Sequence, residues 1–83
     1  MEKITSMTYE SVPALWENRN DIFKDSEIDL SSIKAIDSAG IAFLVQWSKS
    51  LNGRKLKLIN PPIAADNLIA TFALKPLFDI EKN

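Results

Sequence analysis

The sequence predicts an α/β domain in which a mostly parallel or mixed sheet is packed against helices. Short apolar segments of strand type alternate along the chain with longer segments of helical period, and only short connections separate them. Strands joined through helices in this way favour right-handed crossovers and a sheet with helices on it. The chain has 83 residues and neither a linker nor a repeat, so we expect residues 1–83 to form a single domain.

A short strand and a helix are expected first. Residues 3–7 (KITSM) are typical of a strand. Ser11 is the expected N-cap of a helix over residues 12–23, with Pro13 in the first turn, where its missing N–H costs nothing. One face of this helix carries Val12, Leu15, Arg19 and Ile22, with Trp16 and Phe23 beside them.

A second strand and a second helix follow. Apolar and polar side chains alternate in residues 26–33, which predicts a strand. Asp37 or Ser38 is expected to cap a helix that runs to about Leu51, and Gly53 to end it, because glycine tolerates the left-handed conformation found after a helix.

The last third predicts one more strand and one more helix. Residues 54–60 form the strand, with Leu56 and Leu58 on one face. Asn60, Pro61 and Pro62 are expected to form the cap and first turn of the helix, and Pro76 to end it. Residues 77–80 (LFDI) are either a short strand or the start of a terminal helix. Its expected apolar face consists of Ala65, Leu68, Ile69 and Phe72.

The second helix is more apolar than packing on a sheet requires. At 100° per residue, its apolar side chains cover an arc of about 200°, against the 100° or so of an ordinary buried stripe. Phe43 and Val45 lie on opposite flanks, so at least one flank should be exposed or half covered. Either neighbouring helices cover both flanks, or an exposed flank binds a protein partner. Trp16 raises the same alternatives, because tryptophan is enriched in interface hot spots and Arg19 lies one turn away.

The segment Asp37-Ser38-Ala39-Gly40 opens this helix. One of the two polar side chains can accept hydrogen bonds from the first free amides, and the other then lies at the positive end of the helix dipole. Gly40 allows another backbone to approach closely. A phosphate on Ser38 would be stabilised here, although a plain helix cap explains the four residues equally well.

Catalysis is poorly supported by the residue types. The chain has no histidine and no cysteine, which removes the usual general base, thiol nucleophile and zinc ligands. No G-x-S-x-G or Walker-type motif surrounds Ser38, and acid–base work by Asp37 with Ser38 or Lys34 lacks any further catalytic group. We therefore expect no enzyme, no metal and no cofactor.

Charge and hydropathy exclude several partners and locations. Ten basic and eleven acidic residues are spread along the chain, so no basic stripe for nucleic acid is present. The start of the chain lacks the apolar region of a signal peptide, and no apolar run approaches a membrane span. We expect a cytoplasmic protein without direct membrane insertion.

Residues 28–80 resemble the STAS domain of bacterial anti-sigma-factor antagonists. The resemblance is carried by IDLSSIKAIDSAGIAFLVQW, NGRKLKLIN and LIATFALKPLFDI. It implies a STAS-like fold in which the serine matching Ser38 is phosphorylated by an anti-sigma kinase. One departure is clear: STAS domains normally have two strands before the first helix, and here we expect the first of them to be missing. Such an open sheet edge is usually covered, so we expect a homodimer or a partner there.

Within the family the chain is most similar to the MlaB group, the small STAS subunits of bacterial ABC transporters that maintain outer-membrane lipid asymmetry. PALWE in the first helix, the short domain and the apolar second helix carry this likeness. It implies a non-catalytic accessory subunit that binds the ATPase subunit and is peripheral to the inner membrane through it; the alternative is an anti-sigma-factor antagonist switched at Ser38. The expected partner-binding residues are Trp16, Asp37, Ser38, Ala39, Gly40, Ile41, Phe43 and Trp47.

Overall fold

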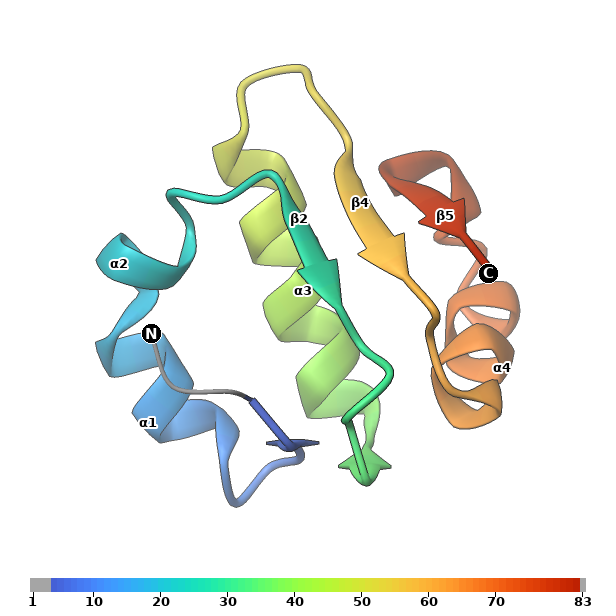
Figure 1. Ribbon diagram of the computed structural model, residues 1–83, viewed down its shortest axis with the longest axis horizontal. Helices are drawn as coiled ribbons and strands as arrows, with labels where there is room; N and C mark the ends of the chain where they lie inside the picture. Colours follow the sequence, from blue (N-terminus) through green and yellow to red (C-terminus); the bar gives the residue numbers. More distant parts are fainter. Residues whose placement is uncertain (1–3, 83) are drawn as a thin grey trace.

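The structure, a computed structural model, describes residues 4–82 and is an α/β fold with small parallel sheets and four α-helices (Figure 1). The elements in chain order are β1 (Ser6–Met7), α1 (Val12–Glu17), α2 (Arg19–Ile22), β2 (Glu27–Asp29), β3 (Ala35–Ile36), α3 (Ser38–Ser50), β4 (Leu56–Ile59), α4 (Ile63–Thr71), the 3-10 turn η1 (Lys75–Leu77) and β5 (Phe78–Glu81). The α/β class predicted from the sequence is confirmed.

All strand pairs in the described part of the chain are parallel. β1 pairs with β3, and a second sheet has the order β2-β4-β5. In this sheet Ile28, Leu58 and Ile80 are in register, and so are Glu27, Lys57 and Asp79. Because side chains alternate across a strand, the first row shares one face and the second row shares the other.

The helices cover one face of the strands. In Figure 1, α3 lies behind the strands, with α1 and α2 on one side of it and α4 on the other. Leu56 and Leu58, which were predicted to share a face, are both fully buried beneath the helices. Glu27, Asp29, Asp79 and Glu81 are exposed on the opposite face. The sheet therefore has an apolar inner face and an acidic outer face.

An aromatic cluster fills the space between α2 and α3. The ring of Phe23 is stacked on that of Trp47, with centroids 5.7 Å apart, and lies 5.5 Å from that of Phe43. The indole N–H of Trp47 donates a 2.8 Å hydrogen bond to the backbone oxygen of Asp25. A buried tryptophan needs such a partner, so this bond fixes where the chain leaves α2.

The predicted first helix is in fact two helices. Asn18 lies between α1 and α2 with φ −99° and ψ 13°, and its side-chain amide donates to the oxygen of Ala14. Asparagine competes with the helical hydrogen bonds in this way, which explains the break. Ser11 is the N-cap residue, as predicted, but its hydroxyl bonds to the backbone N–H of Thr8 instead of a helix amide.

Other element predictions had mixed outcomes. The second predicted helix is α3, and it begins and ends close to where it was predicted. Residues 77–80 contribute to a strand, β5. The predicted strand over residues 3–7 is shorter, and Lys3 lies outside the described residues. β3 was not predicted. Phe72 was placed on the buried face of the third predicted helix, α4, but it follows the last helical residue and is 50% exposed. The prediction that Asn60 caps this helix is wrong: the N-cap residue is Pro62, and Asn60 precedes it with φ 51°.

Candidate functional site

The amino end of α3 is organised by the carboxylate of Asp37, which is the N-cap residue. Its Oδ1 accepts hydrogen bonds from the backbone N–H groups of Ala39 at 2.9 Å and Gly40 at 3.2 Å. Its Oδ2 accepts a hydrogen bond from the backbone N–H of Tyr9 at 2.9 Å. These bonds, that from Tyr9 most of all, hold the pKa of Asp37 below its usual value. Asp37 is therefore an ionised structural cap that ties the loop after β1 to α3.

Ser38 is the exposed residue of this turn. It is the first residue of α3, and its hydroxyl makes no hydrogen bond to any residue in the range 4–82. Because Asp37 already occupies the first amides of the helix, the Ser38 hydroxyl is available to a partner or a modifying enzyme. The structure thus resolves which of the two polar residues is the cap.

A groove of about 300 Å³ starts at Ser38 and runs along α3. It is lined by Ser38, Ile41, Ala42, Val45, Gln46, Phe72 and Leu74. Phe72 forms the far wall from the end of α4 and leaves half of its side chain exposed. The site therefore combines a free hydroxyl, a helix amino end and an apolar groove, an arrangement suited to binding another protein.

Gly40 belongs to the packing of the fold. A Cβ at this position would lie 2.1 Å from the backbone oxygen of Met7 and 2.9 Å from Cγ1 of Ile36. The expected close approach of another backbone is confirmed, and the backbone is that of β1 in this same chain. Gly40 is buried, so it offers no surface to a partner, while Ala39 is half-buried with its N–H bound to Asp37.

Three of the expected partner-binding residues lie in the hydrophobic core. Ile41 and Phe43 are each 2% exposed and Trp47 is 1% exposed. The prediction that Phe43 and Trp47 form part of a docking surface is therefore corrected, because the aromatic cluster with Phe23 covers their flank of α3. Ile41 lines the groove that starts at Ser38 but exposes almost none of its side chain. The opposite flank, at Val45, is only half covered, which agrees with the expectation that one flank stays open.

Trp16 remains at the surface, with 40% of its area exposed. The guanidinium carbon of Arg19 lies 4.3 Å from the centre of the Trp16 ring, and the Arg19 Nη1 donates to the Trp16 backbone oxygen at 2.9 Å. This cation–π pair holds the indole in one orientation. The Trp16 ring also packs on that of Phe23, so this exposed tryptophan lies on the Phe43 flank of α3 and not beside the groove that starts at Ser38. Its predicted role in partner binding stays a prediction.

Tyr9 and Phe72 are exposed aromatic residues that the sequence analysis did not select. Tyr9 is 72% exposed and adjoins the α3 amino end through its bond to Asp37. Phe72 could have been found from its position, since it follows the last full turn before a helix stop. No local signal marks Tyr9, because its neighbourhood depends on a contact across 28 residues.

Comparisons with known proteins add no relative. The sequence matches no protein-family model, and no curated protein or solved structure matches it significantly. Within residues 4–82, no helix is long and apolar enough to cross a membrane.

Proposed function

We propose that this chain is a non-catalytic binding module that docks on a partner protein through the amino end of α3. The observation that carries the proposal is the free, exposed hydroxyl of Ser38 at the mouth of an apolar groove, beside a helix end already capped by Asp37. The docking surface consists of Ser38, Ala42, Val45, Gln46 and Phe72. Tyr9, which adjoins the amino end of α3 through its bond to Asp37, is the candidate aromatic neighbour of this surface. Trp16 packs on Phe23 at the opposite flank of α3 and lies apart from it.

The partner we propose is the ATPase subunit of a bacterial ABC transporter for phospholipids. This rests on the resemblance of residues 28–80 to the STAS domain and of the whole chain to the MlaB group. The chain would then be a cytoplasmic accessory subunit, held at the inner membrane by its partner, in a system that maintains outer-membrane lipid asymmetry. By binding one conformation of the ATPase better than another, it would shift the ATPase toward that conformation.

The test is a pull-down from native cytoplasm and membranes with mass spectrometry, comparing the wild type with Ser38→Arg. Ser50→Arg is the matched control, because Ser50 is exposed at the opposite end of the same helix. We expect an ABC ATPase to be recovered with the wild type and the control but not with Ser38→Arg. Equal recovery with all three, or a loss explained by unfolding of Ser38→Arg in a urea titration, would overturn the assignment.

A second candidate function is that of an anti-sigma-factor antagonist regulated by phosphorylation of Ser38. The exposure of Ser38 at the amino end of a helix favours it, because the helix dipole stabilises a phosphate there. The same pull-down separates the two functions. A kinase-like partner, together with phosphate on Ser38 in the recovered protein, would replace the transporter reading.

A further inference from the structure

Strand β5 has an open edge. It is the last strand of the β2-β4-β5 sheet, and no other strand of residues 4–82 pairs with its free edge, the edge away from β4. The backbone oxygen of Glu81 accepts the N–H of Asn60, so the backbone groups of Glu81 point toward the β4 side. Because these groups alternate in direction along a strand, the N–H and C=O of Ile80 point away from β4. They can accept one further strand.

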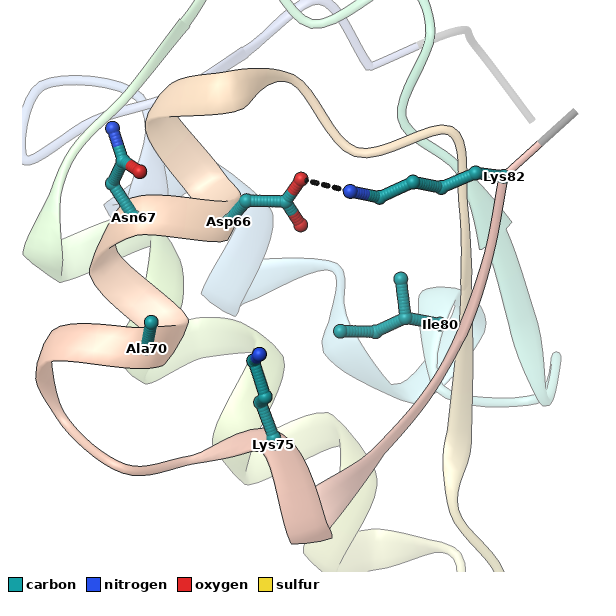
Figure 2. Close-up of a pocket in the computed structure, with 6 residues that line it drawn as sticks. All are labelled: Asp66, Asn67, Ala70, Lys75, Ile80 and Lys82. Atoms are coloured by element: carbon teal, nitrogen blue, oxygen red, sulfur yellow. Dashed lines mark hydrogen bonds and ion pairs between the residues drawn. The ribbon is translucent and has the colours of Figure 1, made fainter.

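A groove of about 430 Å³ lies between this edge strand and α4 (Figure 2). Figure 2 shows the side chain of Ile80 pointing from β5 toward α4, with Ala70 on the facing helix. Lys82 reaches across the top of the groove to Asp66, and Lys75 rises from below. A helix beside an open edge strand is the geometry in which an added peptide strand can place alternate side chains into a pocket.

The two faces of the sheet carry opposite charge at β5: one face borders the groove, and the other is the outer face, which points away from the helices. On the groove side, Lys82 is paired with Asp66 at 2.6 Å, and Lys75 makes no ion pair with any described residue. On the outer face of the sheet, Asp79 and Glu81 are exposed.

Lys57 is the cation that lies among the outer acids, with its Nζ 3.0 Å from Glu81. Glu81 above all, and then Glu27 and Asp79, raise the pKa of Lys57 above its usual value. The face of the sheet that borders the groove is therefore basic at β5, and the outer face is acidic.

We propose that the outer edge of β5 and the groove beside it bind an extended segment of another protein as an added strand. Its side chains alternate: those entering the groove are apolar, over Ile80, or acidic, near Lys75. Those on the outer face are basic, opposite Asp79 and Glu81. Main-chain hydrogen bonds to Ile80 supply the affinity, and the charge alternation supplies the choice of sequence.

A second copy of this chain is a poor occupant of the same edge. The other open edge of the sheet, β2, carries Glu27 and Asp29 on the same outer face. Pairing β5 with β5, or β5 with β2, would place carboxylates directly opposite carboxylates, which is destabilising. The charges that disfavour self-pairing favour a partner strand with basic outer residues.

The proposed strand site is independent of the proposed function. The groove beside β5 shares no lining residue with the groove that starts at Ser38. A substitution in one groove therefore leaves the lining of the other unchanged, and each site can be tested alone.

The experiment uses two short synthetic peptides and the isotope-labelled full chain in nuclear magnetic resonance titrations. In the first peptide, lysine alternates with valine and glutamate, so that the lysines face outward when valine and glutamate enter the groove. In the second, the lysine and glutamate positions are exchanged. We expect the first to bind about tenfold more tightly, with amide shifts concentrated at Phe78–Glu81 and at Lys75.

Two variants give the control. Ile80→Pro removes the outward N–H without touching the bonds to β4 and should abolish binding of the first peptide, whereas Ile80→Val should retain it. If Ile80→Pro fails to fold, the double variant Lys75→Glu and Asp79→Lys keeps the test open, because it should invert the preference between the two peptides. Equal binding of both peptides, no binding of either, shifts elsewhere on the molecule, or shifts caused by self-association would overturn the proposal.

Discussion

Replacing Gly40 with alanine should destabilise this protein by about 2 kcal/mol, although alanine is the better helix former. The new Cβ would lie 2.1 Å from the backbone oxygen of Met7. Ordinary contact begins at 3.4 Å, so α3 and β1 would have to separate by roughly 1.3 Å. The same Met7 oxygen accepts the N–H of Asp37 at 3.1 Å, and this hydrogen bond would be stretched as well.

The magnitude follows from two opposing effects. Alanine in place of glycine gains at most about 1 kcal/mol in a helix. Overpacking costs about 1–3 kcal/mol and the weakened hydrogen bond about 1 kcal/mol more. The clash is with backbone, so no change of rotamer relieves it. The net loss is a large part of the roughly 4–12 kcal/mol expected for a domain of this size.

Urea unfolding followed by tryptophan fluorescence measures this change, because Trp47 is buried and becomes exposed on unfolding. Ala42→Gly is the control at an exposed position of the same helix and should lose about 1 kcal/mol through helix propensity alone. If Gly40→Ala raised or preserved the stability while Ala42→Gly lowered it, the close contact between α3 and β1 would not constrain this position, and the reasoning would be refuted.

Three further outcomes are expected. Ser48→Ala should lower the free energy of unfolding in urea by about 1–3 kcal/mol. The buried Ser48 hydroxyl donates a hydrogen bond to the backbone oxygen of Leu77 at 2.6 Å and accepts one from the backbone N–H of Leu56 at 3.3 Å. The control Ser50→Ala, at an exposed position, should change the same free energy by less than about 0.5 kcal/mol. The lowered pKa of Asp37 means that its contribution is present above the unfolded-state pKa and is lost as pH falls through the folded-state pKa. The difference in unfolding midpoint between wild type and Asp37→Asn should therefore shrink from pH 7 to about pH 3, and a constant difference would contradict the capping role. Trp47→Phe should cost about 1–3 kcal/mol, because it removes both the hydrogen bond to Asp25 and buried ring area; calorimetry showing no drop in melting temperature would contradict that role.

The sequence alone determined most of the regular elements and the frame of the candidate site. The start of α3 was predictable because its signal is local: an acidic cap, free amides within three residues and a following apolar period. The burial of Leu56 and Leu58 was predictable for the same reason, since alternation along a strand needs no knowledge of its neighbours. Local signals failed at Asn18, where the helix breaks. The apolar residues on both sides of Asn18 keep a continuous helical period, and one long helix or two short ones would show the same period.

Only the tertiary structure decided which flank of α3 is buried. A helical wheel places Phe43 and Val45 on opposite flanks, but it does not say which neighbour packs on each one. The stacking of Phe23 on Trp47 covers the Phe43 flank and leaves Val45 beside the groove with Phe72. Phe43 and Trp47, which were predicted to bind a partner, thus belong to the core, because an aromatic ring gains more from close packing inside the chain than from exposure.

Contacts between distant residues likewise decided the role of Gly40, the position of Tyr9 beside Asp37, and the opposite charges of the two sheet faces at β5. Each depends on where a second element lies, within a few tenths of an ångström for Gly40 and within hydrogen-bond reach for Tyr9. A sequence specifies which side chains are available for such contacts, and the packing of the elements selects which of them are made.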